Sequence, residues 1–404
     1  MNIKRMLIVI LALAIFVCGC GYDNNNSQEI TMAVLRADSN ILSMVEDYNL
    51  QHDKKVTIIE YWPSGNPIDY EDAMTKFTAN LTGKNAPDII YLDSQMNWYE
   101  YAEKNVFEDL SPYIECSEII SRTDYFENAL FCGQYNEKQI AVPLSFLLMT
   151  LIGNPQYVNE DGWSVDDFVK YRLEDRSVEI LQPASWEGIL TAALKYSMDE
   201  YIDWDKKIVD FDKDSFRNLL IALENIEVTD KGSRELDEMI YRGELISRLM
   251  IIGSASPING YRDSIANNGG VVGFPSNSGE QINNIQGQYM FCLSADSDKK
   301  LEGWEFIEYV LANSYCGSGF PSKKDEFDKV MQEALTTDEE WMRIDESEYE
   351  LVINILDKAK PWDGRTDKVI TIIEEEVSSY LSNQKSVEEV IAFINSRVGL
   401  LISE

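Results

Sequence analysis

Histidine is almost absent from this chain, since His52 is the only one among 404 residues. A Ser-His-Asp triad would have to use it, and the sequence has no Gly-x-Ser-x-Gly turn to present a nucleophilic serine. It also has no His-Glu-x-x-His zinc motif and no Walker-type phosphate loop. We therefore expect a protein that is not an enzyme, with no catalytic residues, no cofactor and no bound metal.

Basic residues are scarce as well. The chain contains 35 Lys and Arg residues against 70 Asp and Glu, a net charge of −35. Such a surface repels phosphate backbones and anionic lipid headgroups, so we expect no nucleic-acid partner and no basic membrane-binding face. Two carboxylates could still hydrolyse a glycosidic bond, so a surface glycosidase stays open as an alternative.

Cysteine is sparse and unpatterned. Four of the six cysteines follow the N-terminal segment, at Cys116, Cys132, Cys292 and Cys316, and none forms a CxxC pair. We interpret them as buried thiols that pack as small apolar groups. A disulfide between Cys116 and Cys132 stays open as the alternative in an oxidising compartment.

The N-terminal segment has the layout of a signal peptide. Lys4 and Arg5 precede an apolar run, 7–17, that is shorter than the roughly 20 residues a membrane-spanning helix needs. The run ends in Val-Cys-Gly-Cys, which resembles a bacterial lipobox. We expect 1–19 to be the signal peptide and 20–28 to be a flexible tether with a lipid on Cys20. The protein would then be anchored at the extracytoplasmic face of the bacterial cell membrane.

The remaining chain alternates strand-like and helix-like segments. Apolar runs at 30–35, 56–61 and 88–92 predict strands, and a 3.6-residue period between the first two predicts a helix capped by Ser39. Strands that alternate with helices favour a parallel sheet and an α/β fold. The chain is too long for one core and lacks a linker, so we expect two lobes between which the chain crosses more than once.

Two loops combine aromatic and small polar residues. Residues 61–66 read Tyr-Trp-Pro-Ser-Gly-Asn after a predicted strand, and 361–365 read Pro-Trp-Asp-Gly-Arg before a predicted helix. Ligands of parallel sheets bind beyond the carboxyl ends of strands. An aromatic ring beside carboxylates, amides and an arginine suits a sugar, because the ring stacks on its C–H face while its hydroxyls take hydrogen bonds.

Seven short segments, in order along the chain, are similar to one known family. They are 86–93, 101–113, 138–144, 185–189, 303–310, 319–323 and 385–390. Together they resemble the family 1 extracellular solute-binding proteins of bacterial ABC importers, which include sugar-binding lipoproteins. The resemblance implies a two-lobed periplasmic-binding-protein-like fold, with a ligand cleft between the lobes and several hinge crossings. On this basis 29–144 plus 276–313 would form lobe 1, and 145–275 plus 314–404 would form lobe 2.

The resemblance also implies a function. The protein would capture a carbohydrate, most simply an oligosaccharide, and deliver it as a monomer to the membrane subunits of an ABC permease. The alternative of the same fold is a receptor for a polyamine or a peptide, which the acidic composition would suit. The ligand-binding residues that the resemblance implies are Arg36, Asp38, Tyr61, Trp62, Asp93, Ser94, Gln95, Ser145, Phe146, Trp362, Asp363 and Arg365.

Overall fold

The computed structural model describes most of the chain from residue 29 onwards. The described residues are 29–83, 86–93, 96–154, 156–158, 161–229, 231–255, 258, 261–262, 265, 270–313 and 319–403. The predicted signal peptide 1–19, lipidated Cys20 and tether 20–28 lie outside them, as do Ser94, Gln95 and Cys316. Within these ranges no helix is both long enough and apolar enough to cross a bilayer.

The first lobe is built on the parallel strands that the sequence predicts. β1 (Glu29–Val34) pairs in parallel with β2 (Lys55–Glu60) on one side and with β3 (Ile89–Leu92) on the other. The helix between the first two strands is α2 (Ser39–Gln51), but its N-cap is Asp38 rather than the predicted Ser39. The Asp38 carboxylate accepts a hydrogen bond from the backbone N–H of Ile41 at 2.9 Å, which satisfies an otherwise unpaired helix-end donor.

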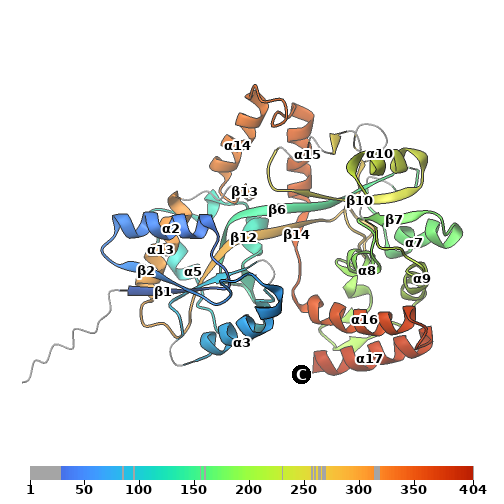
Figure 1. Ribbon diagram of the computed structural model, residues 1–404, viewed down its shortest axis with the longest axis horizontal. Helices are drawn as coiled ribbons and strands as arrows, with labels where there is room; N and C mark the ends of the chain where they lie inside the picture. Colours follow the sequence, from blue (N-terminus) through green and yellow to red (C-terminus); the bar gives the residue numbers. More distant parts are fainter. Residues whose placement is uncertain are drawn as a thin grey trace, which may run out of the picture.

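Helices and short strands complete this lobe on both faces of the sheet (Figure 1). The helices are α3 (Tyr70–Leu81), α4 (Tyr99–Glu103), α5 (Ser111–Cys116), α6 (Glu127–Phe131) and α13 (Lys300–Asn313), with single 3-10 turns η1 (Pro67–Asp69) and η2 (Arg122–Asp124). β4 (Gln134–Tyr135) and β5 (Lys138–Gln139) form a small hairpin. We call these elements and β1–β3 the first lobe.

Two long strands run from the first lobe into the rest of the molecule. β6 (Val142–Gly153) and β12 (Asn283–Leu293) pair antiparallel at the centre of a sheet whose order is β2-β1-β3-β12-β6-β10-β7. Figure 1 shows both strands running between the two halves. A third connection is β14 (Ala359–Pro361), which pairs in parallel with the start of β12. The chain therefore crosses between the halves several times, as predicted.

The second lobe carries further strands of the sheet, a separate two-stranded sheet of β8 and β9, and its own helices. Its strands are β7 (Glu179–Gln182), β8 (Ile202–Asp203), β9 (Ile208–Val209), β10 (Leu245–Ile252) and β11 (Gly270–Val271). Its helices are α7 (Val165–Glu174), α8 (Trp186–Leu194), η3 (Met198–Glu200), α9 (Asp214–Ala222), α10 (Ser233–Arg242), α16 (Arg365–Leu381) and α17 (Val387–Ser403). We call these elements the second lobe. The predicted capping box of α17 is confirmed, because Ser386 and Glu389 exchange side-chain to backbone hydrogen bonds.

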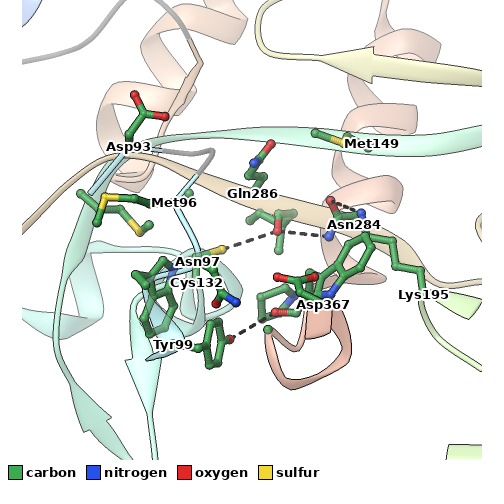
Figure 2. Close-up of a pocket in the computed structure, with 17 residues that line it drawn as sticks. Asp93, Met96, Asn97, Tyr99, Cys132, Met149, Lys195, Asn284, Gln286 and Asp367 are labelled. Atoms are coloured by element: carbon green, nitrogen blue, oxygen red, sulfur yellow. Dashed lines mark hydrogen bonds between the residues drawn. The ribbon is translucent and has the colours of Figure 1, made fainter. Parts of the chain in front are cut away.

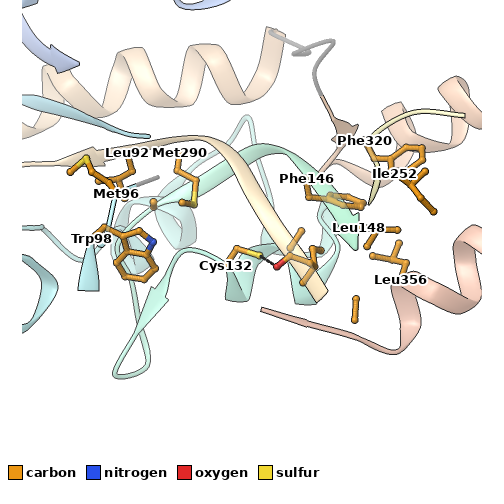
Figure 3. Close-up of a cluster of buried hydrophobic side chains, with 14 of the residues drawn as sticks. Leu92, Met96, Trp98, Cys132, Phe146, Leu148, Ile252, Met290, Phe320 and Leu356 are labelled. Atoms are coloured by element: carbon orange, nitrogen blue, oxygen red, sulfur yellow. Dashed lines mark hydrogen bonds between the residues drawn. The ribbon is translucent and has the colours of Figure 1, made fainter. Parts of the chain in front are cut away.

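Each of the two lobes has an apolar core of its own. One contains α2, α13 and β1, and another contains α7, α8, α9, α16 and α17. A third core follows β6 and β12, where Leu92 and Met96 lie at one end and Phe146 and Phe320 at the other (Figure 3). β13 (Phe320–Pro321), α14 (Lys324–Thr336) and α15 (Glu346–Asp357) pack on it. The fold is thus the predicted two-lobed α/β architecture, and the lobe boundaries given above stay a prediction.

The three cysteines that the structure describes do not cross-link the fold. Cys116 is exposed, Cys132 and Cys292 are buried, and all three are free thiols. The alternative of a disulfide between Cys116 and Cys132 is therefore wrong for this structure. Burial also raises the pKa of Cys132 to about 12, so its thiol stays protonated at neutral pH.

Candidate functional site

A cavity of about 300 Å³ lies between the lobes, beside the crossing strands (Figure 2). The first lobe contributes Asp93, Met96, Asn97, Trp98 and Tyr99 to its lining. The crossing strands contribute Met149, Asn284, Gln286 and Met290, and the second lobe contributes Lys195, Trp362, Gly364 and Asp367. Any solute bound here would touch both lobes at once.

Tyr99 forms a close contact between the lobes at this cavity. Its ring stacks on Trp98 with centroids 3.9 Å apart, and its hydroxyl donates to the carbonyl oxygen of Trp362 at 3.2 Å. The ring lies directly against Gly364, where an added Cβ would fall 2.0 Å from a Tyr99 carbon. Only glycine at position 364 allows the lobes to approach this closely.

Asn284 organises the wall that the crossing strands provide. Its side-chain nitrogen donates to the hydroxyl of Tyr196 at 2.8 Å, and that hydroxyl donates to the carbonyl oxygen of Lys360 at 2.8 Å. The amide oxygen of Asn284 is thereby turned toward Lys195, whose Nζ lies 3.4 Å away. These bonds fix one polar corner of the cavity before any ligand enters.

Lys195 and Asp367 are the charged groups of this corner. The Lys195 ammonium lies 3.8 Å from the centroid of the Trp362 ring, in a cation–π contact. Desolvation lowers the pKa of Lys195 to about 7, although the nearby Asp367 carboxylate acts in the opposite direction. Desolvation likewise raises the pKa of Asp367 to about 6, against the attraction of Lys195.

Two of the predicted site residues line this cavity, Asp93 and Trp362. Asp93 lies at the end opposite Lys195 (Figure 2). The Trp362 indole Nε1 donates to the Thr366 hydroxyl at 2.6 Å, which holds the ring in place. One face of that ring is occupied by the Lys195 ammonium, so that face is not open to a stacking sugar in this structure.

The predicted residues after β1 and β2 do not line the cavity. Asp38 caps α2 and accepts a hydrogen bond from the Tyr289 hydroxyl at 2.6 Å, while exposed Arg36 lies beside Gly65. The Tyr61 hydroxyl accepts from the Asn80 amide at 2.6 Å, and its ring packs edge-on against Phe77.

Trp62 also stays within its own loop. Its indole Nε1 donates to the carbonyl oxygen of Asn66 at 2.9 Å, and its ring meets Tyr70 edge-on at 5.1 Å between centroids. The structure thus brings neither aromatic residue of this loop to the cavity lining.

Ser145 and Phe146 are interior residues, because both are completely buried on β6. The Phe146 ring packs among Phe126, Phe320 and Phe327. Of the residues of β6 only Met149 lines the cavity, whereas the side chains at positions 145 and 146 are enclosed by the protein. We leave these two residues out of the site proposed below.

Asp363 and Arg365 are paired with each other. The Asp363 carboxylate accepts from the backbone N–H and from the guanidinium of Arg365, at 3.0 Å for each of these two bonds. Arg365 also lies over the Trp204 ring, at 4.9 Å from its centroid. Arg365 and Trp204 line a second cavity of about 420 Å³, which shares Asn97, Tyr99 and Gly364 with the first. The two cavities are therefore neighbours separated by Tyr99.

Sequence reasoning missed Tyr99, Lys195, Asn284 and Asp367. Lys195 follows the apolar helix α8, where a lone cation after a run of buried residues was the available signal. Asn284 is 2 % exposed, and burying an amide costs free energy unless it is hydrogen-bonded. Its burial is visible only in the structure. Nothing local to the sequence distinguishes Asp367 from the other acidic residues of the chain.

Residues 33–315 match the family described as bacterial extracellular solute-binding protein. Among curated proteins, no sequence matches this chain significantly.

Solved structures that are similar to this one have low sequence identity and near-complete overlap. An ABC transporter solute-binding protein from Thermotoga lettingae, bound with α-D-tagatose, has 14% identity and a TM-score of 0.59, with 93% of this chain and 99% of that chain covered. An ABC substrate-binding protein from Listeria monocytogenes in complex with cycloalternan has 18% identity and a TM-score of 0.58, with the same coverage.

A sugar-binding protein from Xanthomonas citri has 15% identity and a TM-score of 0.57, with 93% of this chain and 97% of that chain covered. At these identities the likeness shows the shared fold. The family match carries more, because it spans well over half of the residues and contains five of the seven segments that resemble this family. This chain belongs to the bacterial extracellular solute-binding proteins.

Proposed function

We propose that this protein captures a carbohydrate, most simply an oligosaccharide, in the cavity between its lobes and hands it to an ABC import permease. The observation that carries the proposal is the lining of the cavity. Aromatic rings, amides, two carboxylates and an ammonium from both lobes converge on about 300 Å³. Such a mixture suits a ligand with apolar ring faces and many hydroxyl groups. The similar structures bound to tagatose and to cycloalternan support the same choice.

The residues that we propose to contact the ligand are Asp93, Tyr99, Lys195, Asn284, Trp362 and Asp367. Ser94 and Gln95 follow Asp93 directly and stay predicted contacts. Tyr99 contacts Gly364 across the cavity in this structure. We propose that this contact forms when the lobes close around the solute.

We further propose that a lipid on Cys20 holds the protein, as a monomer, at the extracytoplasmic face of the membrane beside its permease. A Cys20→Ser variant should be released into the medium, and labelled palmitate should be incorporated by the wild type only. Retention of the variant at the membrane would contradict the anchor. Loss of sugar uptake after deletion of the gene would support transport.

The experiment that tests the binding function is a thermal-shift screen of residues 24–404 against sugars, oligosaccharides, polyamines and short peptides. A ligand at a hundred times its dissociation constant stabilises a protein by about 2.7 kcal/mol, which moves the melting temperature by a few degrees. A shift with one class of sugar supports the proposal. A shift with polyamines or peptides alone would replace the substrate class.

Turnover distinguishes binding from catalysis. Asp93 and Asp367 place two carboxylates on one cavity, which is the observation that keeps glycoside hydrolysis as a second candidate. We expect stoichiometric binding without the release of new reducing ends from the bound oligosaccharide. Sustained release that is lost in Asp93→Asn would overturn the binding role.

A further inference from the structure

The corner of the cavity around Lys195 holds a cation and an anion that are not paired with each other. Lys195 directly follows α8, and Asp367 lies in the first turn of α16. Both line the cavity (Figure 2). Among the described residues, no carboxylate oxygen lies within 4.0 Å of the Lys195 ammonium.

The neighbours of Lys195 hold its ammonium without neutralising it. They are the Asn284 amide oxygen at 3.4 Å and the rings of Trp362 and Phe274, whose centroids are 3.8 Å and 5.4 Å away. A reversed amide would point the Asn284 oxygen at the carbonyl oxygens of Ile285 and Lys360, to which its nitrogen now donates at 3.4 Å. Trp362 is held by Thr366. An ammonium has three donors, so at least one stays available to a ligand.

Asp367 supplies the complementary acceptor. Within the part of the chain that the structure describes, its carboxylate has no hydrogen-bond donor or ion-pair partner. Its surroundings remove water, as the shift of its pKa to about 6 indicates. A carboxylate that is half-buried and faces a cavity gains most from a ligand that donates to it.

We propose that neighbouring hydroxyl groups of a neutral sugar bridge Lys195 and Asp367, one accepting from the ammonium and the other donating to the carboxylate. This inference rests on the proposed function and narrows its ligand to a neutral sugar. Trp362 is a positioning residue in this arrangement, because its ring holds the Lys195 ammonium at the cavity instead of stacking on the ligand with that face.

The charge balance of the corner favours a neutral ligand over a charged one. A uronic acid would satisfy Lys195 but would bring its carboxylate toward Asp367. An amino sugar or a polyamine would satisfy Asp367 but would face Lys195. A pair of hydroxyls satisfies both groups and brings no like charge toward either, since a hydroxyl is neutral and both donates and accepts.

Charge-removing variants test the bridge. Lys195→Met and Asp367→Asn each delete one end, and Lys360→Met is the matched control because Lys360 is exposed on the neighbouring strand β14. The probes are neutral oligosaccharides (cellobiose, maltotriose, xylotriose), digalacturonate and the glucosamine dimer, measured by calorimetry. We expect the wild type to prefer a neutral probe. Each site variant should bind that probe at least tenfold more weakly, and the control should stay within twofold.

The charged probes provide a second readout. Relative to the wild type, Lys195→Met should gain preference for the glucosamine dimer, and Asp367→Asn should gain preference for digalacturonate. Should either variant fail to fold, Lys195→Gln or Asp367→Ser takes its place, with the melting temperature of the unliganded protein as the check.

The outcomes separate the two proposals. Unchanged affinity of both variants for a neutral sugar would overturn the bridge and leave the sugar receptor intact. A wild type that prefers digalacturonate or the amine would overturn the neutrality of the ligand. A wild type that binds a polyamine or peptide and no sugar in the wider screen would overturn both.

Discussion

The two tryptophan loops of this protein are alike in sequence and different in the structure. Each places a tryptophan beside small polar residues and a glycine, at 61–66 and at 361–365. Trp62 bonds to the carbonyl oxygen of Asn66 and packs on Tyr70, both within or beside its own loop. Trp362 lines the cavity between the lobes, with Lys195 above its ring.

The difference arises from elements far away in the sequence. Lys195 follows α8, and Tyr99 belongs to α4, yet both meet the loop around Trp362. No comparable partner from the other lobe reaches Trp62 among the contacts that the structure describes. An aromatic loop thus becomes part of a binding site through its distant neighbours and not through its own composition.

The largest expected effect on ligand affinity comes from Gly364, and Gly65 is the matching glycine of the other loop. Gly364→Ala would place a methyl group against the Tyr99 ring and hold the lobes apart, since overpacking costs about 1–3 kcal/mol. We expect ligand affinity, measured by calorimetry, to fall at least tenfold. Gly65→Ala is the control. Its φ of +60° makes alanine strained there by about 1 kcal/mol, so stability should fall while affinity stays unchanged. Equal affinities for both variants would break the comparison.

The tryptophans themselves give the next effect. Trp362→Ala removes the ring that positions Lys195, and we expect ligand affinity to fall about tenfold to a hundredfold, or 1.4–2.8 kcal/mol. Trp62→Ala should change affinity by less than threefold, because its contacts are within the first lobe. Titration calorimetry with the sugar from the screen measures both. A larger loss for Trp62 than for Trp362 would reverse our assignment of the two loops.

Lys195→Met tests the environment of the Trp362 loop through the pH dependence of protein stability. The folded-state pKa of Lys195 is lowered from 10.5 to about 7, so between these values the unfolded chain binds the extra proton. The stability of the wild type should therefore rise as the pH increases from about 7 toward 10. Below pH 7 the cost of burying the charged Lys195 ammonium is fully present. The variant should lack this rise and should be about 1–2 kcal/mol more stable at pH 6.5. Urea melts at several pH values measure the difference. A parallel pH dependence of the two proteins would contradict the desolvated lysine.

The smallest effect should come from the support of the Trp362 ring. Thr366→Val removes the acceptor of the indole N–H and keeps the side-chain shape, which should weaken ligand binding about twofold to fivefold. The control is Thr371→Val, one turn further along α16, whose hydroxyl donates to the backbone carbonyl of Asp367. Equal affinities of the two variants would indicate that the ring needs no such support.

Much of the fold could be predicted because its signals are local. The strands β1, β2 and β3, their parallel pairing and the capping box of α17 follow from runs of apolar residues and from residues three positions apart. The cap of α2 was misplaced by one residue, since Asp38 and Ser39 are both suitable caps and only the entering backbone selects Asp38. The candidate site was predicted less well. Asp93 and Trp362 line the cavity, but Phe146 is in a core and Lys195 was overlooked.

By itself, the sequence determined the α/β class, the two-lobed architecture and membership of the solute-binding family, because periodicity and ordered motifs are properties of short segments. Tertiary structure alone decided which aromatic loop lines the cavity and which charges meet there. Lys195 and Asn284 are 89 residues apart and Asn284 and Asp367 are 83 apart, yet all three line one cavity. The physical reason is that the site forms where the lobes and the crossing strands converge, and no local pattern encodes that convergence.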